Sequence, residues 1–197
     1  METIHVFDFD GTLTKRDTLL EFIRFTKGNI PFVGGFFIHS PLLVLMKFGL
    51  YSNNKAKQKI FSFFFKGMTK EDFDIYCSSF AIEQAQKILR PKGIRTVKDV
   101  LMRGDRVVIL TASVSDWVQP FFGGLDVNVI GTKVEVDGSG RLTGIFTTPN
   151  CYGTEKVRRF LESYPDRENY HLVAYGDSKG DRPLLELADE SFYKPFR

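Results

Sequence analysis

The feature that most constrains the fold is a short apolar run that ends in two acids. Residues 4–7 have the β-branched and aromatic content of a buried strand, and Asp8 and Asp10 follow at once, on either side of Phe9 and before Gly11. Open parallel sheets bind their ligands at the carboxyl ends of their strands. We therefore predict a parallel α/β sheet with a ligand site around this acid pair.

The later part of the chain repeats this pattern. Apolar runs at residues 106–110 and 171–175 are typical of buried parallel strands, and each is followed by polar residues. Such alternation of strands and helices predicts an α/β fold with one parallel sheet. The other expected elements are helices near residues 94–104, 115–122, 156–164 and 183–188, strands at 127–130 and 191–193, and a hairpin turning at 137–140.

Residues 15–90 are expected to form an all-helical cap, inserted after the first strand of a core made of residues 1–14 and 91–197. Thr18 and Glu21 have the spacing of a capping box and predict a helix that runs to about residue 27. Start signals at Ser52 and Thr69 predict two more helices. One face of the last helix is expected to be buried through Phe73, Tyr76, Cys77 and Phe80.

Residues 30–50 form a long apolar stretch within this insertion. Its length is that of a membrane span, which needs about 20 apolar residues. Two prolines, several glycines and Lys47 interrupt it, so a buried helical hairpin or a segment at a membrane interface is the preferred interpretation. A true span stays open as an alternative.

Charge is distributed unevenly along the chain. The net charge is +3, yet no Asp or Glu occurs from Phe22 to Lys70, where eight Lys and Arg residues give +8, so the remainder carries −5. The same interval holds 10 of the 20 phenylalanines. This basic, aromatic composition suits contact with anionic headgroups. Alternatively, the phenylalanines form the core of the cap and the lysines its solvated face.

The length of the chain, its first residues and its cysteines indicate how many domains it has and in which compartment it is found. A chain of 197 residues is long enough for one core with an inserted module. The first strand begins within a few residues of Met1, without a signal-peptide pattern, so we expect a cytoplasmic protein. Cys77 and Cys151 lack metal-ligand spacing, and buried or bystander thiols are the simplest interpretation of both.

Polar clusters follow three of the predicted strands: Asp8 with Asp10, Thr111 with Ser113, and Asp177 with Asp181. Parallel neighbouring strands would bring these clusters together at one edge of the sheet. Each residue has a plainer interpretation. Asp8 and Asp10 could be turn residues without a chemical role. Ser113 or Asp181 could be no more than a helix cap, and Lys156 could be a solvated helix lysine.

The residue types in these clusters suit phosphate chemistry. Closely packed carboxylates repel unless a cation neutralises them, and oxygen-only ligands suit Mg²⁺. Thr111 and Ser113 can donate hydrogen bonds to anionic oxygens, and Lys156 brings a positive charge. The three histidines show no ligand spacing.

The motifs resemble, in order and context, those of haloacid dehalogenase-like phosphatases. They are the stretch from Asp8 to Thr14, the triplet Thr111-Ala112-Ser113, Lys156, and the last acidic motif from Gly176 to Asp181. The resemblance covers nearly the whole chain. It implies a Rossmann-like core with a helical cap, and phosphatase activity that depends on Mg²⁺.

The same resemblance implies roles for individual residues. Asp8 would be the nucleophile that forms an aspartyl-phosphate, and Asp10 would protonate the leaving oxygen and then activate water. Mg²⁺ would bind the Asp8 carboxylate, the Asp10 backbone carbonyl and Asp177. The phosphoryl group would be held by Thr111, Ala112, Ser113 and Lys156, with Thr12 and Asp181 in support.

The substrate is the least determined part of this prediction. The architecture is similar to that of phosphoserine phosphatase-like members, but the acid after the first motif is Asp17 where those enzymes use Glu. In addition, no arginine lies between Arg24 and Arg90, and Gly180 stands where they use Asn. The cap looks similar to that of the phosphatidylglycerophosphatase C type. A lipid-like or amphiphilic phosphate is therefore the first hypothesis, and a soluble metabolite such as phosphoserine the second.

Two interpretations from other classes stay open. Receiver domains also use a phosphorylatable Asp, a Thr or Ser and a Lys, but their acidic pair precedes the phosphorylated Asp, whereas Asp10 follows Asp8. A non-catalytic phosphate-binding module is the other. We expect a phosphorylated small-molecule or lipid substrate, peripheral membrane contact through the cap at the inner face of the membrane, and no nucleic-acid partner. The sequence does not determine the oligomeric state or whether the cap opens and closes.

Overall fold

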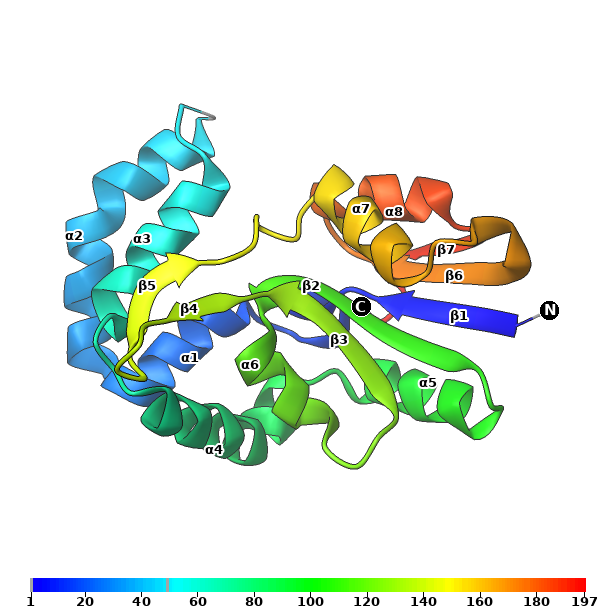
Figure 1. Cartoon of the computed structure of the whole chain (residues 1–197), viewed down its shortest axis with the longest axis horizontal. Coiled ribbons are helices and arrows are strands. Elements are labelled where there is room, and N and C mark those ends of the chain that lie inside the picture. The colour runs from blue at the N-terminus through cyan, green and yellow to red at the C-terminus, as the bar shows by residue number, and fades with distance from the viewer. Residues whose placement is uncertain (1, 49) are drawn as a thin grey trace.

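The centre of the molecule is a five-stranded parallel sheet (Figure 1). The structure is a computed structural model that describes residues 2–48 and 50–197, with the side chains of Leu43, Met46 and Lys47 left undescribed. The strand order is β3-β2-β1-β6-β7, and every neighbouring pair is parallel. The strands are β1 (Glu2–Phe7), β2 (Arg106–Val114), β3 (Val127–Thr132), β6 (Tyr170–Gly176) and β7 (Glu190–Tyr193). The predicted parallel α/β sheet is confirmed.

Helices cover both faces of the sheet, as the alternating pattern predicts. Figure 1 shows α5 (Pro91–Met102) and α6 (Ser115–Val118) on one side, and α7 (Thr154–Ser163) and α8 (Arg182–Leu187) on the other. Alternate residues of β2 enter the two hydrophobic clusters: Val107 and Ile109 join one, and Val108 and Leu110 join the other. Short 3₁₀ turns lie at Gln119–Phe122, Arg167–Asn169 and Lys179–Asp181.

In the described residues, a short π-helical turn at Phe9–Leu13 and four α-helices lie between β1 and α5. The α-helices are α1 (Thr18–Lys27), α2 (Asn29–Lys47), α3 (Asn53–Phe65) and α4 (Lys70–Ile88). The helix starts predicted at Ser52 and Thr69 are confirmed. The prediction of a capping box at Thr18 is wrong. Asp17 is the N-cap of α1, and its carboxylate accepts hydrogen bonds from the Leu19 and Leu20 amides. This change frees the Thr18 side chain for another contact.

The apolar stretch at residues 30–50 does not form the predicted buried hairpin. Most of it lies in the single helix α2, which packs against α1 and α3 on one side. Its other side exposes large apolar side chains, among them Ile30 (87% exposed), Phe37 (81%) and Phe48 (74%), the last just beyond the helix end. None of the helices in the described ranges combines the length and hydropathy needed to cross a bilayer.

The predicted turn at residues 137–140 joins β4 (Val134–Val136) to β5 (Leu142–Phe146) in an antiparallel hairpin. This hairpin lies against α3, although it belongs to the part predicted as core. The Leu142 amide donates to the Met68 carbonyl at 2.9 Å, and the Gly67 amide donates to the Leu142 carbonyl at 2.8 Å. At Gly144, where φ is +84°, a Cβ would come within 2.4 Å of Ser62 Oγ. The division into cap and core by residue range therefore stays a prediction.

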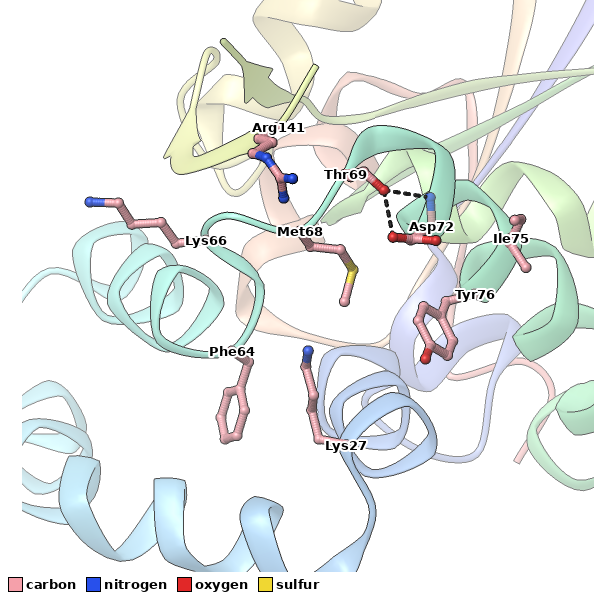
Figure 2. Close-up of a pocket in the computed structure, with 9 residues that line it drawn as sticks. All are labelled: Lys27, Phe64, Lys66, Met68, Thr69, Asp72, Ile75, Tyr76 and Arg141. Atoms are coloured by element: carbon pink, nitrogen blue, oxygen red, sulfur yellow. Dashed lines mark hydrogen bonds between the residues drawn. The ribbon is translucent and has the colours of Figure 1, made fainter. Parts of the chain in front are cut away.

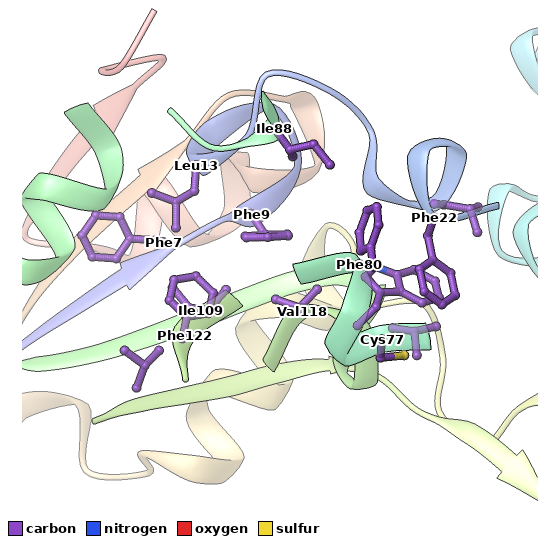
Figure 3. Close-up of a cluster of buried hydrophobic side chains, with 14 of the residues drawn as sticks. Phe7, Phe9, Leu13, Phe22, Cys77, Phe80, Ile88, Ile109, Val118 and Phe122 are labelled. Carbon is purple, nitrogen blue, oxygen red and sulfur yellow. The ribbon is translucent and has the colours of Figure 1, made fainter. Parts of the chain in front are cut away.

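One aromatic cluster joins the sheet to the helices that follow β1 (Figure 3). Phe22 of α1 contacts Phe73 and Phe80 of α4 and stacks on Trp117 of α6, with ring centroids 5.0–5.6 Å apart. Cys77 is buried in the same cluster, as predicted, but Tyr76 is 37% exposed, so its assignment to the buried face is wrong. This shared core fixes α1 against the edge of the sheet where the acids lie.

Candidate active site

Asp8 lies directly beyond the end of β1, at the carboxyl edge of the sheet. Its backbone amide donates to the Tyr175 carbonyl at 2.9 Å, which extends the pairing with β6 by one residue and fixes the direction of the side chain. The chain then turns at Gly11, where φ is +84° and a Cβ would lie 2.5 Å from Asp177 Oδ2. Only glycine combines this backbone angle with so close an approach.

Lys156 connects two buried acids. It comes from the first turn of α7, it is 2% exposed, and its Nζ lies 2.6 Å from Asp8 Oδ1 and 2.6 Å from Asp181 Oδ1. The interpretation of Lys156 as a solvated lysine is therefore wrong. Thr12 Oγ1 donates to the other Asp8 oxygen at 3.0 Å, so both oxygens of this carboxylate have a partner.

Asp181 both caps a turn and holds Lys156. Its Oδ2 accepts hydrogen bonds from the Asp177 and Ser178 amides at 3.1 and 2.9 Å and from Ser178 Oγ at 2.7 Å, while its Oδ1 takes Lys156. The helix-cap interpretation is only partly correct, because Asp181 stands at the N-cap of α8 but its side chain makes no capping hydrogen bond to that helix. At Gly176 a Cβ would lie 2.5 Å from the Asp181 Cβ, so the strand end must be glycine for the acid to pack this closely.

Asp10 is held by a separate set of donors. Its Oδ1 accepts from both the Thr18 amide and the Thr18 hydroxyl at 2.7 Å, and its Oδ2 accepts from Ser113 Oγ at 2.5 Å. Trp117 Nε1 donates to Thr18 Oγ1 at 3.2 Å and completes the network. Ser113 therefore contacts Asp10 and is not the cap of α6, which has Val114 at its N-cap.

The remaining predicted residues differ in how directly they face the site. Ala112 lines the cavity beside the acids, and its carbonyl accepts from Thr132 Oγ1 at 3.0 Å. Thr111 is completely buried, and its hydroxyl accepts the Ser113 amide at 3.0 Å. In the described part of the chain, Thr111 and Thr12 stand behind the cavity lining and support Ser113 and Asp8.

A cavity of about 250 Å³ opens over these acids. Asp8, Asp10, Lys156 and Asp181 line it, with Ser178 of the last acidic motif and three residues that the sequence did not single out for the site: Asn53, Lys57 and Tyr152. Asp17 also lines it. The spacing of Asn53 and Lys57, four residues apart, places them on one face of α3. No sequence signal shows that this face would meet the end of β1, nor that Thr18 would hold Asp10.

Burial dominates the electrostatics of the site. It raises the pKa of Asp8 to about 7, although the Lys156 ammonium acts in the opposite direction. Burial, followed by the charge of Asp17, raises the pKa of Asp10. Burial also opposes ionisation of Asp181, yet the contact with Lys156 and the hydrogen bonds from Ser178 together outweigh it and lower the pKa of that acid. The two carboxylates overcome burial at Lys156 and raise the pKa of its ammonium group.

Three acids could hold a metal ion. Asp8, Asp177 and Asp181 each place a carboxylate oxygen within 4.8 Å of the other two. Such an oxygen-only donor set, near an anionic cavity, suits Mg²⁺. Burial raises the pKa of Asp177, and a guanidinium nitrogen of Arg197 pairs with its Oδ2. The Asp10 carboxylate is turned toward Thr18 and Ser113, which is consistent with a predicted metal contact through its backbone carbonyl.

Comparison with known proteins places this site in a family. The sequence pattern of haloacid dehalogenase-like hydrolases matches residues 5–186. The chain belongs to this family. The resemblance drawn from the motifs, and with it the prediction of a hydrolytic enzyme, is confirmed. Protein CicA from Caulobacter vibrioides is 34% identical over 195 residues, which cover 97% of this chain and 85% of that protein.

Solved structures share the fold of this hydrolase. A protein of unknown function from Bordetella pertussis Tohama I superposes with a TM-score of 0.83 at 20% identity, over 97% of this chain and 89% of its own. A substrate-bound phosphoserine phosphatase superposes with a TM-score of 0.67 at 18% identity, over 98% and 86%. At these identities the likeness supports the predicted Rossmann-like α/β fold.

Proposed function

We propose that this hydrolase is a Mg²⁺-dependent phosphatase that acts on phosphate monoesters through an aspartyl-phosphate. The observation that carries the proposal is the position of Asp8, which lies at the carboxyl end of the central strand with its carboxylate held by Lys156 and Thr12. A carboxylate fixed in this way faces a phosphoryl group in the cavity without a conformational change.

The reaction follows from the two acids. An Asp8 oxygen attacks phosphorus and the bond from phosphorus to the ester oxygen breaks, while Asp10 gives its proton to the leaving oxygen. The Asp10 carboxylate then takes a proton from a water molecule, whose oxygen attacks phosphorus and displaces Asp8. Thr18 and Ser113 hold Asp10 in place for both proton transfers.

Positive charge must balance the phosphoryl group. Lys156 supplies one charge beside Asp8, and Asp181 orients its ammonium group. Asp8, Asp177 and the Asp10 carbonyl would hold Mg²⁺, which supplies further charge to neutralise the phosphoryl oxygens. Ala112, which lines the cavity, and its neighbour Ser113 would bind the remaining phosphoryl oxygens, with Thr111 behind them.

Hydrolysis of p-nitrophenyl phosphate tests this chemistry. We expect steady release of p-nitrophenol with Mg²⁺, its loss with excess chelator, and its loss in Asp8→Asn. The exposed Asp99 of α5 provides the control, and Asp99→Asn is expected to behave as the unmodified protein. A single burst of phosphorylation without turnover would instead support a receiver-like switch. Phosphate binding without any release would support a non-catalytic module.

For the substrate, we propose a phosphate ester of amphiphilic or lipid-like character, reached by peripheral contact of α2 with the inner face of a membrane. The support comes from the exposed apolar side chains of α2 and from the acid-free interval that surrounds it. The phenylalanines divide between the two earlier interpretations, since Phe22, Phe61 and Phe65 are core, whereas Phe37 and Phe48 are exposed.

A soluble phosphorylated metabolite is the second candidate. Its support is the polar lining of the cavity, where Asp17, Asn53 and Lys57 offer contacts to a small charged molecule, together with the fold shared with phosphoserine phosphatases. Flotation with anionic liposomes and a panel of phosphorylated lipids and metabolites separate the two. Absence of liposome binding, with turnover of soluble esters alone, would remove the lipid hypothesis.

A further inference from the structure

A second cavity, of about 570 Å³, lies away from the active site (Figure 2). It is formed where the end of α1, the end of α3, the start of α4 and the turn of the β4–β5 hairpin meet. No residue that lines it also lines the cavity over Asp8. Its lining consists of Lys27, Phe64, Lys66, Met68, Thr69, Asp72, Ile75, Tyr76 and Arg141.

Positive charge predominates in this cavity. Figure 2 shows the Lys27 ammonium and the Arg141 guanidinium pointing toward Met68 from opposite sides, whereas the Lys66 ammonium points away from the cavity. Lys27 is partly buried, which lowers the pKa of its ammonium, and among the described residues no carboxylate pairs with it. Arg141 donates one N–H to the Gly67 carbonyl at 2.7 Å, which leaves other guanidinium donors available.

The single carboxylate in the cavity is already bound. Asp72 Oδ2 accepts the Thr69 hydroxyl at 2.6 Å, and the Asp72 amide donates to the same hydroxyl at 3.1 Å as part of the N-cap of α4. Two cations, Lys27 and Arg141, therefore point into a cavity whose lining carboxylate is held by its own helix. Among the residues that line the cavity, the cations outnumber the carboxylates.

The rest of the lining is apolar and partly exposed. Ile75 is 58% exposed and Tyr76 37%, and Phe64 and Met68 complete this wall. The exposure of Tyr76, which the helical pattern had assigned to the core, places it at this cavity instead. Cationic donors beside an apolar wall match a ligand with an anionic group and an apolar part.

We propose that this cavity is a second binding site, separate from the active site, for a phosphate-type anion attached to an apolar chain. Lys27 and Arg141 contact the anion, and Phe64, Met68 and Tyr76 contact the chain. The anion can come from a lipid headgroup or from free phosphate, and the apolar wall favours the lipid. The exposed helix α2 starts two residues after Lys27, so a lipid in this cavity would lie beside that helix.

The test is a titration of the 197-residue chain with Mg²⁺ present, followed by amide chemical shifts. The probes are dihexanoyl phosphatidylglycerol, which is a phosphodiester and no substrate for a monoesterase, dihexanoyl phosphatidylcholine, and inorganic phosphate. The Gly67, Thr69 and Gly140 amides report on the cavity, and the Gly11 and Gly180 amides report on the active site. We expect phosphatidylglycerol to shift the first set more than phosphatidylcholine does.

Three variants are expected to weaken, to tighten and to leave unchanged the binding of phosphatidylglycerol. Lys27→Gln is expected to weaken phosphatidylglycerol binding about tenfold, which corresponds to about 1.4 kcal/mol. Asp72→Asn removes the negative charge but keeps an oxygen that can accept the Thr69 hydroxyl. It is expected to tighten phosphatidylglycerol binding several-fold. The exposed Lys87 of α4 is the control, and Lys87→Gln is expected to change nothing.

Each result decides the proposal. Shifts confined to the active-site amides, or equal affinity of Lys27→Gln and the unmodified protein, would overturn it. If inorganic phosphate binds as tightly as phosphatidylglycerol, the inference that the ligand carries an apolar chain is overturned. Hydrolysis of p-nitrophenyl phosphate is expected to be unchanged in Lys27→Gln, so loss of the proposed phosphatase activity and loss of this site are separate observations.

Discussion

The active site and the outer face of α2 depart from ordinary folding in opposite ways. The active site buries Asp8, Asp181 and Lys156, which are charged side chains that folding alone would leave in water. The α2 face leaves Ile30 and Phe37 in water, which folding alone would bury. Both arrangements cost stability, so both indicate a function, but they indicate different ones.

The two regions differ in whether their side chains have partners within the protein. Every charge of the buried group has a partner inside the protein, with Lys156 between two carboxylates and Asp181 on two backbone amides. The apolar side chains of α2 lack such a partner within the described chain, apart from the face that meets α1 and α3. A complete internal network suits chemistry, whereas an unpaired surface suits contact with another phase or molecule.

Lys156→Met is expected to give the largest effect, because it breaks the buried network. Removing the ammonium leaves two uncompensated carboxylates, at a cost of about 3–5 kcal/mol in the free energy of unfolding at pH 8. Chemical denaturation at pH 8 and pH 5 measures it. The cost is expected to fall at pH 5, since burial already raises the pKa of Asp8 to about 7 and its carboxyl becomes neutral there. An equal cost at both values would contradict the network.

Thr18→Val is expected to act on the position of Asp10 rather than on the fold. It removes the hydroxyl that joins Asp10 to Trp117 but keeps the backbone donor, so we expect kcat for p-nitrophenyl phosphate to fall about ten- to hundredfold. Thr26→Val, which removes a hydroxyl bonded only to helix carbonyls, is the control. Similar losses in both variants would show that Thr18 is merely structural.

Phe37→Ser tests the exposed apolar face of α2. Phe37 and Ile82 are both 81% exposed, but Phe37 is on α2 and Ile82 is on α4. Burial of a phenylalanine in an apolar phase is worth about 1.5–3 kcal/mol, so Phe37→Ser is expected to reduce binding to anionic liposomes about tenfold or more. Ile82→Ser is expected to leave it unchanged. Equal effects of the two substitutions would mean that the α2 face has no special role.

The smallest effect is expected at the two thiols, which are both buried. Burial raises the pKa of Cys77, and it raises the pKa of Cys151 to about 11. Neither thiol is expected to react with iodoacetamide at pH 8 in the folded protein, and both are expected to react in denaturant. Mass spectrometry measures this. Rapid labelling of folded Cys151, which lies near Lys156, would show that the site is more open than its burial indicates.

Local patterns predicted most of the fold. The runs of apolar residues identify β1, β2 and β6, because a strand buried on both faces needs a continuous apolar sequence. The order of the acidic and hydroxyl motifs predicted which side chains would meet at the sheet edge. Both signals are local, since each depends on residues within one strand and the turn after it.

The errors arose where one residue had two possible partners. Thr18 fits a capping box, but Asp17 takes that role and Thr18 bonds Asp10 and Trp117 instead. Tyr76 lies on the helical stripe of α4, but that side of the helix ends at the second cavity. Each outcome also depends on a residue of a distant element, Trp117 for Thr18 and Arg141 at the second cavity, and local spacing carries no information about such contacts.

By itself, the sequence determined the parallel sheet, most of the helices and the acids at the ends of β1 and β6. Strand burial and turn chemistry act between near neighbours and are therefore visible in the order of residues. Tertiary structure alone decided that Lys156 reaches both Asp8 and Asp181, that Thr18 holds Asp10, and that α2 stays exposed. These outcomes depend on which helix face meets which strand, and that is settled only when the whole core packs.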